Sequence, residues 1–395
     1  MKEKYAKLLL QALNLKNKKY LFIELPSFLS EFKELLLNTA KEYDLREVYV
    51  NEKDVFKKHD LLVSLDQENI NKHPFFDESI KNKYAKLDAA FLFIQSMVPN
   101  LMDDVSPKKI SDTTKHIRST QMYFRNLYET DKLNWCIAGV PNKWWAEGLG
   151  MTEEELWDNI FKVSLVDDES DAYENWINKL ERMKKRADKL NDYNFDYLHY
   201  TNNLGTDLCV YLPEGHIWCS GYGSHGEICN LPTEEIFTSP LYNKTEGVVY
   251  STKPLFYNGV MIENFNLTFK DGKVVEYSAE SGEDLLKTII ENDDYSCYLG
   301  ECALVSFDSP INNTGILFKE TLYDENASCH LALGMGFTEC NSKAKDKKGD
   351  DLRNIGVNDA ATHVDFMVGD ETLKIVGVTK DGKEIVIMEN GNLVI

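Results

Sequence analysis

Four acidic side chains and two histidines in the second half of this 395-residue chain lie in segments where they could converge on metal ions. Carboxylates and imidazoles together bind divalent ions such as zinc, cobalt and manganese. A pair of such ions that shares one water is suited to hydrolysing an amide bond at neutral pH. The six candidate ligands are Glu235, Glu301, Glu325, His330, His363 and Asp365.

The pattern around four of these ligands predicts how they are held. Residues 362–368 have the composition of a β-strand. Side chains two residues apart on a strand point to the same face of the sheet, so we expect His363 and Asp365 to lie together. Glu325 and His330 are five residues apart, which is a poor fit to one helix face, so we expect a turn between them.

The other two carboxylates are expected beside buried strands. Glu301 lies near the start of the apolar run 298–305, and Glu235 directly precedes Ile236. An unpaired buried carboxylate is very costly, so each needs a partner. Taken singly, each candidate also has an ordinary alternative, because a lone Glu is usually salt-bridged and a lone His is usually structural. No single segment has the strength of a helical His-Glu-x-x-His site.

Apolar runs alternate with helical patterns in the first part of the chain, which predicts a parallel α/β sheet. From about Gly205 the pattern changes to short strands, with Asp-Gly hairpin turns of the primed types expected at residues 270–273 and 380–383. We therefore predict an α/β domain with trailing helices at residues 1–200 and a β-rich (α+β) metal-binding domain at residues 201–395. Predicted strands of the first domain are residues 20–24, 46–50, 90–95 and 135–138, and its predicted helical stretches are residues 27–43, 108–128 and 152–190.

The chain has 65 acidic and 44 basic side chains, a formal net charge of -21. This excess argues against nucleic acid or an anionic membrane as a partner, and no apolar run approaches the ~20 residues of a membrane span. It suits metal ions and the free amine of a peptide, although an acidic surface also keeps a cytosolic protein in solution. The start lacks a secretory-signal pattern and the eight cysteines are dispersed, so we expect reduced thiols and a cytoplasmic location.

Two other patterns suggest different chemistry. Residues 221–226 match the glycine pattern of dinucleotide-binding loops, but the residues that follow do not predict a helix, so a glycine-rich turn is the better interpretation. A zinc site is the second alternative, although its spacing is not that of familiar zinc motifs. Its four candidate ligands are His216, Cys219, His225 and Cys229.

Four segments of the second half resemble the thermophilic metallo-aminopeptidase family, of which aminopeptidases T and S are typical. They are residues 230–240, 299–305, 322–334 and 363–369, and their order and separations also match the family. A weaker resemblance extends upstream through Trp135, Trp157 and residues 144–146 and 205–208.

The resemblance implies removal of N-terminal amino acids from peptides, two cocatalytic divalent ions and a homodimer. Carried over position by position, it makes the six residues named above the metal ligands and Glu301 the carboxylate that bridges both ions. A bridging carboxylate holds two ions close enough to share a water, whose pKa they lower. Glu234 is the candidate general base, and a salt-bridged carboxylate is the alternative.

The chain departs from the family at two positions. Phe337 stands where the family usually has Tyr, and Ala360 stands where Ser is common. A tyrosine hydroxyl could stabilise the oxyanion of the reaction, which is worth up to ~3 kcal/mol. Two alternatives therefore remain: a non-catalytic metal- or peptide-binding relative, and a two-metal hydrolase of a different amide.

Overall fold

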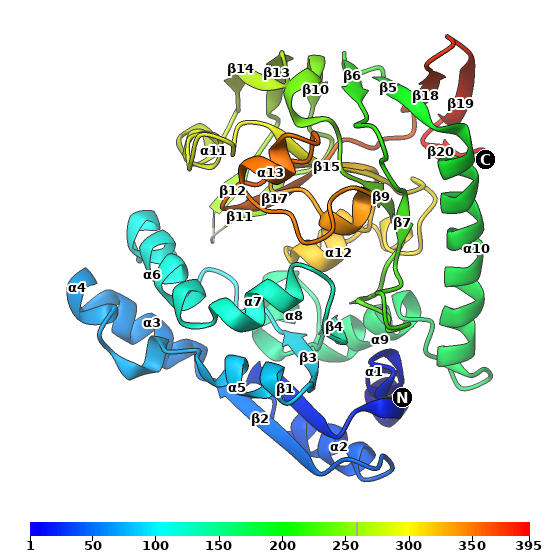
Figure 1. Ribbon diagram of the computed structural model, residues 1–395. Helices are drawn as coiled ribbons and strands as arrows, with labels where there is room; N and C mark the ends of the chain where they lie inside the picture. The colour runs from blue at the N-terminus through cyan, green and yellow to red at the C-terminus, as the bar shows by residue number, and fades with distance from the viewer. Residues whose placement is uncertain (258–259) are drawn as a thin grey trace. The chain divides into compact units, whose positions relative to one another are not determined.

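The structure is a computed structural model that describes residues 1–257 and 260–395 (Figure 1). It divides into two units, each built from separate stretches of chain. The α/β unit comprises Met1–Ile177 and Tyr222–Pro232, and the β-rich unit comprises Asn178–Gly221 and Thr233–Ile395. The domain boundary expected at residue 200 stays a prediction.

A parallel sheet forms the centre of the α/β unit, as predicted from the alternation of apolar runs and helices. Its strands are β1 (Tyr20–Pro26), β2 (Glu47–Lys53), β3 (Ala90–Gln95), β4 (Trp135–Gly139) and β8 (Asn230–Leu231). They pair in the order β2-β1-β3-β4-β8. Its helices are α1 (Lys2–Ala12), α2 (Ser30–Ala40), α3 (Val55–Ser64), α4 (Gln67–Ile70), α5 (Ile80–Lys86), α6 (Pro107–Thr120), α7 (Met122–Tyr128), α8 (Lys143–Gly148) and α9 (Glu153–Val163).

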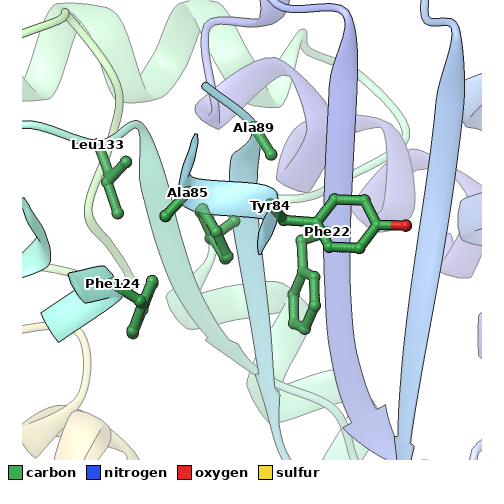
Figure 2. Close-up of a cluster of buried hydrophobic side chains, with 7 residues drawn as sticks. Phe22, Tyr84, Ala85, Ala89, Phe124 and Leu133 are labelled. Atoms are coloured by element: carbon green, nitrogen blue, oxygen red, sulfur yellow. The ribbon is translucent and has the colours of Figure 1, made fainter. Parts of the chain in front are cut away.

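Aromatic side chains join this sheet to its helices. Phe22 of β1 lies 5.2 Å from Phe91 of β3, measured between ring centroids, and Phe91 lies 4.8 Å from Phe124 of α7. Tyr84 of α5 belongs to the same buried cluster, and its ring packs against the ring of Phe22, as Figure 2 shows. Strands inside a parallel sheet are covered on both faces, which explains the buried apolar runs of β1 and β3, whereas the edge strand β2 is only half-buried.

Two predicted helical stretches are interrupted. The stretch at residues 108–128 breaks at Gln121 into α6 and α7, because Gln121 leaves the helical conformation at φ −115°. The stretch at residues 152–190 is α9 and α10 (Ala172–Tyr193). Leu165, with φ at 57°, lies in the loop between them. The apolar side chains of Trp157, Trp176 and Leu180 are buried.

Antiparallel sheets form the β-rich unit, as predicted. The first has the order β14-β13-β10-β6-β5-β18-β19-β20 and the second has the order β17-β16-β15-β9-β7. The first sheet contains β5 (Phe195–Thr201), β6 (Asp207–Tyr211), β10 (Glu246–Tyr250), β13 (Asn266–Lys270), β14 (Lys273–Ser278), β18 (Lys374–Thr379), β19 (Glu384–Glu389) and β20 (Asn392–Leu393). The second contains β7 (Cys219–Ser220), β9 (Ile236–Thr238), β15 (Leu299–Leu304), β16 (His330–Gly334) and β17 (His363–Met367). Strands β11 (Leu255–Tyr257) and β12 (Val260–Ile262) pair with each other, and the α-helices that follow are α11 (Glu283–Ile290), α12 (Thr321–Glu325) and α13 (Asp350–Arg353).

Both predicted hairpins are present, but only one has the expected turn. Asp271 and Gly272 have φ at 51° and 78°, as a primed turn between β13 and β14 requires. In the hairpin of β18 and β19 the backbone N–H of Gly382 donates to the carbonyl of Thr379, so Lys380 and Asp381 are the central residues. Neither of them has a positive φ, so the prediction of a primed turn was wrong there.

The second sheet contains a bulge that changes which side chains share a face. Leu299 pairs with Leu333, yet Glu301 pairs with Ala332, so Gly300 is the extra residue. A Cβ at Gly300 would lie 2.3 Å from the carbonyl oxygen of Met335, so only glycine fits there. Because a shift of one residue moves every side chain to the opposite face, the bulge decides the direction of Glu301.

Candidate metal centre

Four of the six predicted ligands lie on one face of the second sheet. Ala332 pairs with Glu301 on one side and with Asp365 on the other, and directly paired residues share a face. His330 is two residues from Ala332 on β16, and His363 is two residues from Asp365 on β17, so both join that face. The methyl group of Ala332 leaves room between the two carboxylates.

The facing side chains form two groups that share Glu301. One comprises Glu235, Glu301 and His330, and in the other Glu301 groups with His363 and Asp365. Within each group the candidate ligand atoms lie within 4.8 Å of one another. Glu235 directly precedes β9, which pairs with β15, and this pairing brings Glu235 to the group.

The distances within these groups suit a bound cation. His363 Nε2 lies 3.0 Å from Glu301 Oε2 and 3.0 Å from Asp365 Oδ1. His330 Nε2 lies 3.1 Å from Glu235 Oε2. Two ligand atoms on one tetrahedral ion, each ~2.1 Å from it, would be ~3.4 Å apart. Small adjustments would therefore admit ions between these pairs.

Glu325 is the sixth predicted ligand, and it lies at the end of α12, which packs against β17. The turn predicted between Glu325 and His330 is present, because α12 ends at Glu325 and β16 begins at His330. Burial raises the pKa of Glu325 well above its usual value, and the charges of Asp365, Glu235 and Glu301 raise it further. Its carboxylate therefore belongs electrostatically to the same cluster.

Backbone carbonyls orient both histidines. His330 Nδ1 lies 3.3 Å from the carbonyl oxygen of Ser328, and His363 Nδ1 lies 2.6 Å from that of Met335. A carbonyl only accepts, so Nδ1 of each ring donates and Nε2 faces the carboxylates. His330 Nε2 is buried, and its 3.1 Å contact with Glu235 Oε2 lacks the geometry of a hydrogen bond. A buried imidazole nitrogen held in this way has the orientation of a metal ligand, so the residues present fit a divalent ion.

The cluster is buried and contains more carboxylates than imidazoles. Burial raises the pKa of Glu301 to about 6. Burial lowers the pKa of His330, but Glu235, together with the charges of Glu301 and Asp365, raises it to about 9. The pKa of His363 is likewise well above its usual value, because Asp365 and Glu301 outweigh burial. Four carboxylates against two imidazoles leave a buried excess of negative charge, which divalent cations would neutralise.

Phe337 and Ala360, the two departures from the family pattern, lie at different places in the β-rich unit. The ring of Phe337 lies 4.9 Å from the ring of His363 and 5.5 Å from that of Phe237, measured between centroids. The ring of Phe337 therefore packs against a predicted ligand of the cluster. Ala360 is buried in the loop before β17.

Two residues that the sequence interpretation missed hold Glu234 in place. Lys179 forms a buried ion pair with Glu234, and the side chain of Asn326 accepts from the backbone N–H of Glu234 at 2.7 Å. Asn326 also donates to the carbonyl of Leu322 at 2.9 Å, so it joins α12 to the segment before β9. The position of Asn326 beside Glu325 was a usable signal, whereas nothing in the sequence paired Lys179 with Glu234. The ion pair matches the salt-bridged alternative, and a role of Glu234 as general base stays a prediction.

None of the metal-binding groups found among the described residues contains His216, Cys219 or Cys229. His225 groups instead with Asp131 and Glu227. The glycine-rich stretch at 221–226 is a loop, and the segment after it leads into β8 rather than into a helix. This supports the interpretation as a turn. No helix within the described residues has the length and apolar character needed to cross a membrane.

Comparisons with known proteins show which family and which solved fold this chain resembles. The family described as "Thermophilic metalloprotease (M29)" matches residues 1–393. Aminopeptidase AmpS of Bacillus subtilis (strain 168) is 38% identical to this chain, over 98% of the chain and 97% of the relative. Aminopeptidase 2 of Geobacillus stearothermophilus is 34% identical, over 99% and 97%. The solved structure of wild-type AmpT from Thermus thermophilus has a TM-score of 0.89 at 30% identity and covers 100% of this chain and 99% of its own.

Proposed function

This chain belongs to the M29 family of thermophilic metalloproteases, and from that premise we propose that it is an aminopeptidase that releases N-terminal amino acids from peptides. One observation carries the proposal: two groups of buried metal-binding side chains share Glu301 on one face of a sheet. The names of the relatives, which are aminopeptidases, support the reaction.

In this proposal the six predicted ligands hold two divalent ions. Glu235 and His330 would serve one ion, His363 and Asp365 would serve the other, and Glu301 would contact both. Glu325 would complete the set from the end of α12. Bound divalent ions lower the pKa of a water and polarise the scissile carbonyl. The protein's part is to fix the carboxylates by the pairing of β15, β16 and β17 and to fix the imidazoles by the carbonyls of Ser328 and Met335.

Several finer predictions belong to the same proposal. Zinc, cobalt or manganese all suit the mixture of carboxylates and imidazoles. The net charge of -21 favours approach of the protonated amine of a peptide. The eight cysteines are thiols, which supports a cytoplasmic location. A homodimer rests on the family resemblance.

A second candidate function is a metal- or peptide-binding protein without turnover. Phe337 favours this candidate, because its ring places no donor beside His363. A hydrolase of another amide is the third candidate. Substrates with and without a free amine separate it from an aminopeptidase.

The first test measures hydrolysis of leucyl amide by protein stripped of metal and reloaded with zinc, cobalt or manganese. We expect no turnover in the stripped protein, turnover after reloading, and none with N-acetyl-leucyl amide, because the proposed reaction needs both metal and a free amine. Turnover of the acetylated substrate would favour the hydrolase of another amide. Full metal loading without turnover of either substrate would favour the binding protein.

Glu234 can be tested apart from its ion pair. Glu234→Gln should lower kcat by about 100-fold if the carboxylate takes a proton from the attacking water. Lys179→Met alone should lower the free energy of unfolding by ~3 kcal/mol or more, because it leaves a buried carboxylate without its counter-charge. The double variant removes both charges and should recover stability in denaturant unfolding, while its kcat stays low. Recovery of kcat in the double variant would mean that Glu234 serves only the ion pair.

A further inference from the structure

A second group of metal-binding side chains lies in the α/β unit, apart from the residues proposed for catalysis. Asp131, His225 and Glu227 each offer one ligand atom, and these atoms lie within 4.8 Å of one another. Asp131 follows α7 in the chain. The other two belong to Tyr222–Pro232, the second stretch of chain that contributes to the α/β unit. The group therefore joins two parts of the unit that are more than ninety residues apart in sequence.

Glu227 is the feature that ordinary packing does not explain. Its side chain is 0% exposed, yet its Oε1 has no hydrogen-bonding partner among the described residues. Oε2 accepts from the backbone N–H of His225 at 3.0 Å. Oε1 lies 3.7 Å from His225 Nδ1, too far for a hydrogen bond. Two ligand atoms bound to one tetrahedral ion would be ~3.4 Å apart, so this gap is close to that of a shared ion.

The loop around the group keeps these side chains in place. The backbone N–H of Ser224 donates to Asp131 Oδ2 at 2.8 Å, and the Ser224 hydroxyl donates to the same oxygen. The side chain of Asn14 donates to the carbonyl of His225 at 2.7 Å. A Cβ at Gly223 would lie 2.4 Å from Glu227 Oε1, so any other residue at this position would displace the carboxylate. The positions of the three ligands are thus set by contacts other than a metal.

We propose that Asp131, His225 and Glu227 form an additional site for a divalent ion such as Zn²⁺, which fastens the returning stretch Tyr222–Pro232 to the loop after α7. Two carboxylates and one imidazole make a ligand set that zinc accepts, with water in the remaining position. The His225 side chain is 40% exposed, so solvent reaches this position. The ion would provide Glu227 Oε1 with the partner that it lacks.

The test counts zinc ions. Wild-type protein and variants are stripped of metal, saturated with ZnCl₂, passed through a desalting column and analysed for zinc per chain by mass spectrometry of the digested protein. We expect His225→Ala and Glu227→Gln each to retain one zinc fewer than the wild type. His199→Ala is the matched control, because His199 is similarly exposed at 38% and is also paired with an acid, Asp207, at 2.7 Å. It should retain the wild-type number.

The same count separates this site from the proposed catalytic centre. In Glu301→Gln the difference made by adding His225→Ala should persist, so a failure of the aminopeptidase proposal leaves this result intact. Equal zinc in the wild type, His225→Ala and Glu227→Gln would overturn the proposal. If the variants do not fold, zinc-edge anomalous diffraction from wild-type crystals soaked in ZnCl₂ decides: a peak between the three side chains supports the site, and its absence overturns it.

Discussion

Glu301→Gln should lower kcat for leucyl amide by on the order of 10³-fold, because loss of metal-supplied stabilisation worth ~4 kcal/mol corresponds to about three decades in rate. Glu301 is the residue that both metal-binding groups share. Gln keeps the size of the side chain but loses the negative charge, so one substitution weakens both proposed ion positions. We expect the metal content at a fixed metal concentration to fall together with kcat.

A surface carboxylate gives the control for this substitution. Glu276 is exposed on β14, in the sheet that holds none of the proposed ligands, so Glu276→Gln makes the same chemical change outside the proposed centre. It should keep the kcat and the metal content of the wild type. If Glu301→Gln instead retained both, the role of Glu301 as the shared ligand would be wrong, even if the protein were an aminopeptidase.

Phe337→Tyr should raise kcat by up to roughly 100-fold with little change in KM, since a correctly placed oxyanion donor is worth up to ~3 kcal/mol in the transition state. The ring of Phe337 already packs against His363 at 4.9 Å and against Phe237 at 5.5 Å between centroids. A tyrosine with the same ring position would add only a hydroxyl beside the cluster. Steady-state kinetics on leucyl amide measures the effect.

The matched control is Phe56→Tyr, which adds the same hydroxyl to a ring of α3 that is 36% exposed. It should leave kcat unchanged. An unchanged kcat in Phe337→Tyr would mean that another donor of this chain already stabilises the oxyanion. A gain from zero to measurable turnover would identify the wild type as the non-catalytic relative and Phe337 as the cause.

The sequence alone was sufficient to predict those features that depend on residues close together in the chain. Apolar runs predicted the strands of the α/β unit, and β3 has the predicted bounds, Ala90–Gln95. The two-residue period placed His363 and Asp365 on one face, as the strand β17 confirms. The five-residue spacing predicted the turn before His330. Helix ends were less accurate, because α6 and α7 are divided by a single non-helical residue, Gln121.

Contacts between distant segments could not be derived in this way. Nothing local pairs Lys179 with Glu234 or brings Asp131 to Glu227, because such contacts depend on how whole elements pack. The direction of Glu301 is the sharpest case. If β15 and β16 paired without the bulge, in the register of Leu299 with Leu333, Glu301 would pair with Leu331. Its side chain would then lie on the face opposite to His330.

The sequence by itself therefore determined the family, the first four strands of the α/β unit and the six candidate ligands of the proposed catalytic centre. Only the tertiary structure decided that they meet, because the bulge at Gly300 sets Glu301 opposite Ala332 and Asp365. A bulge depends on close contact with a neighbouring strand, here the carbonyls of Gly334 and Met335, which the local sequence does not specify.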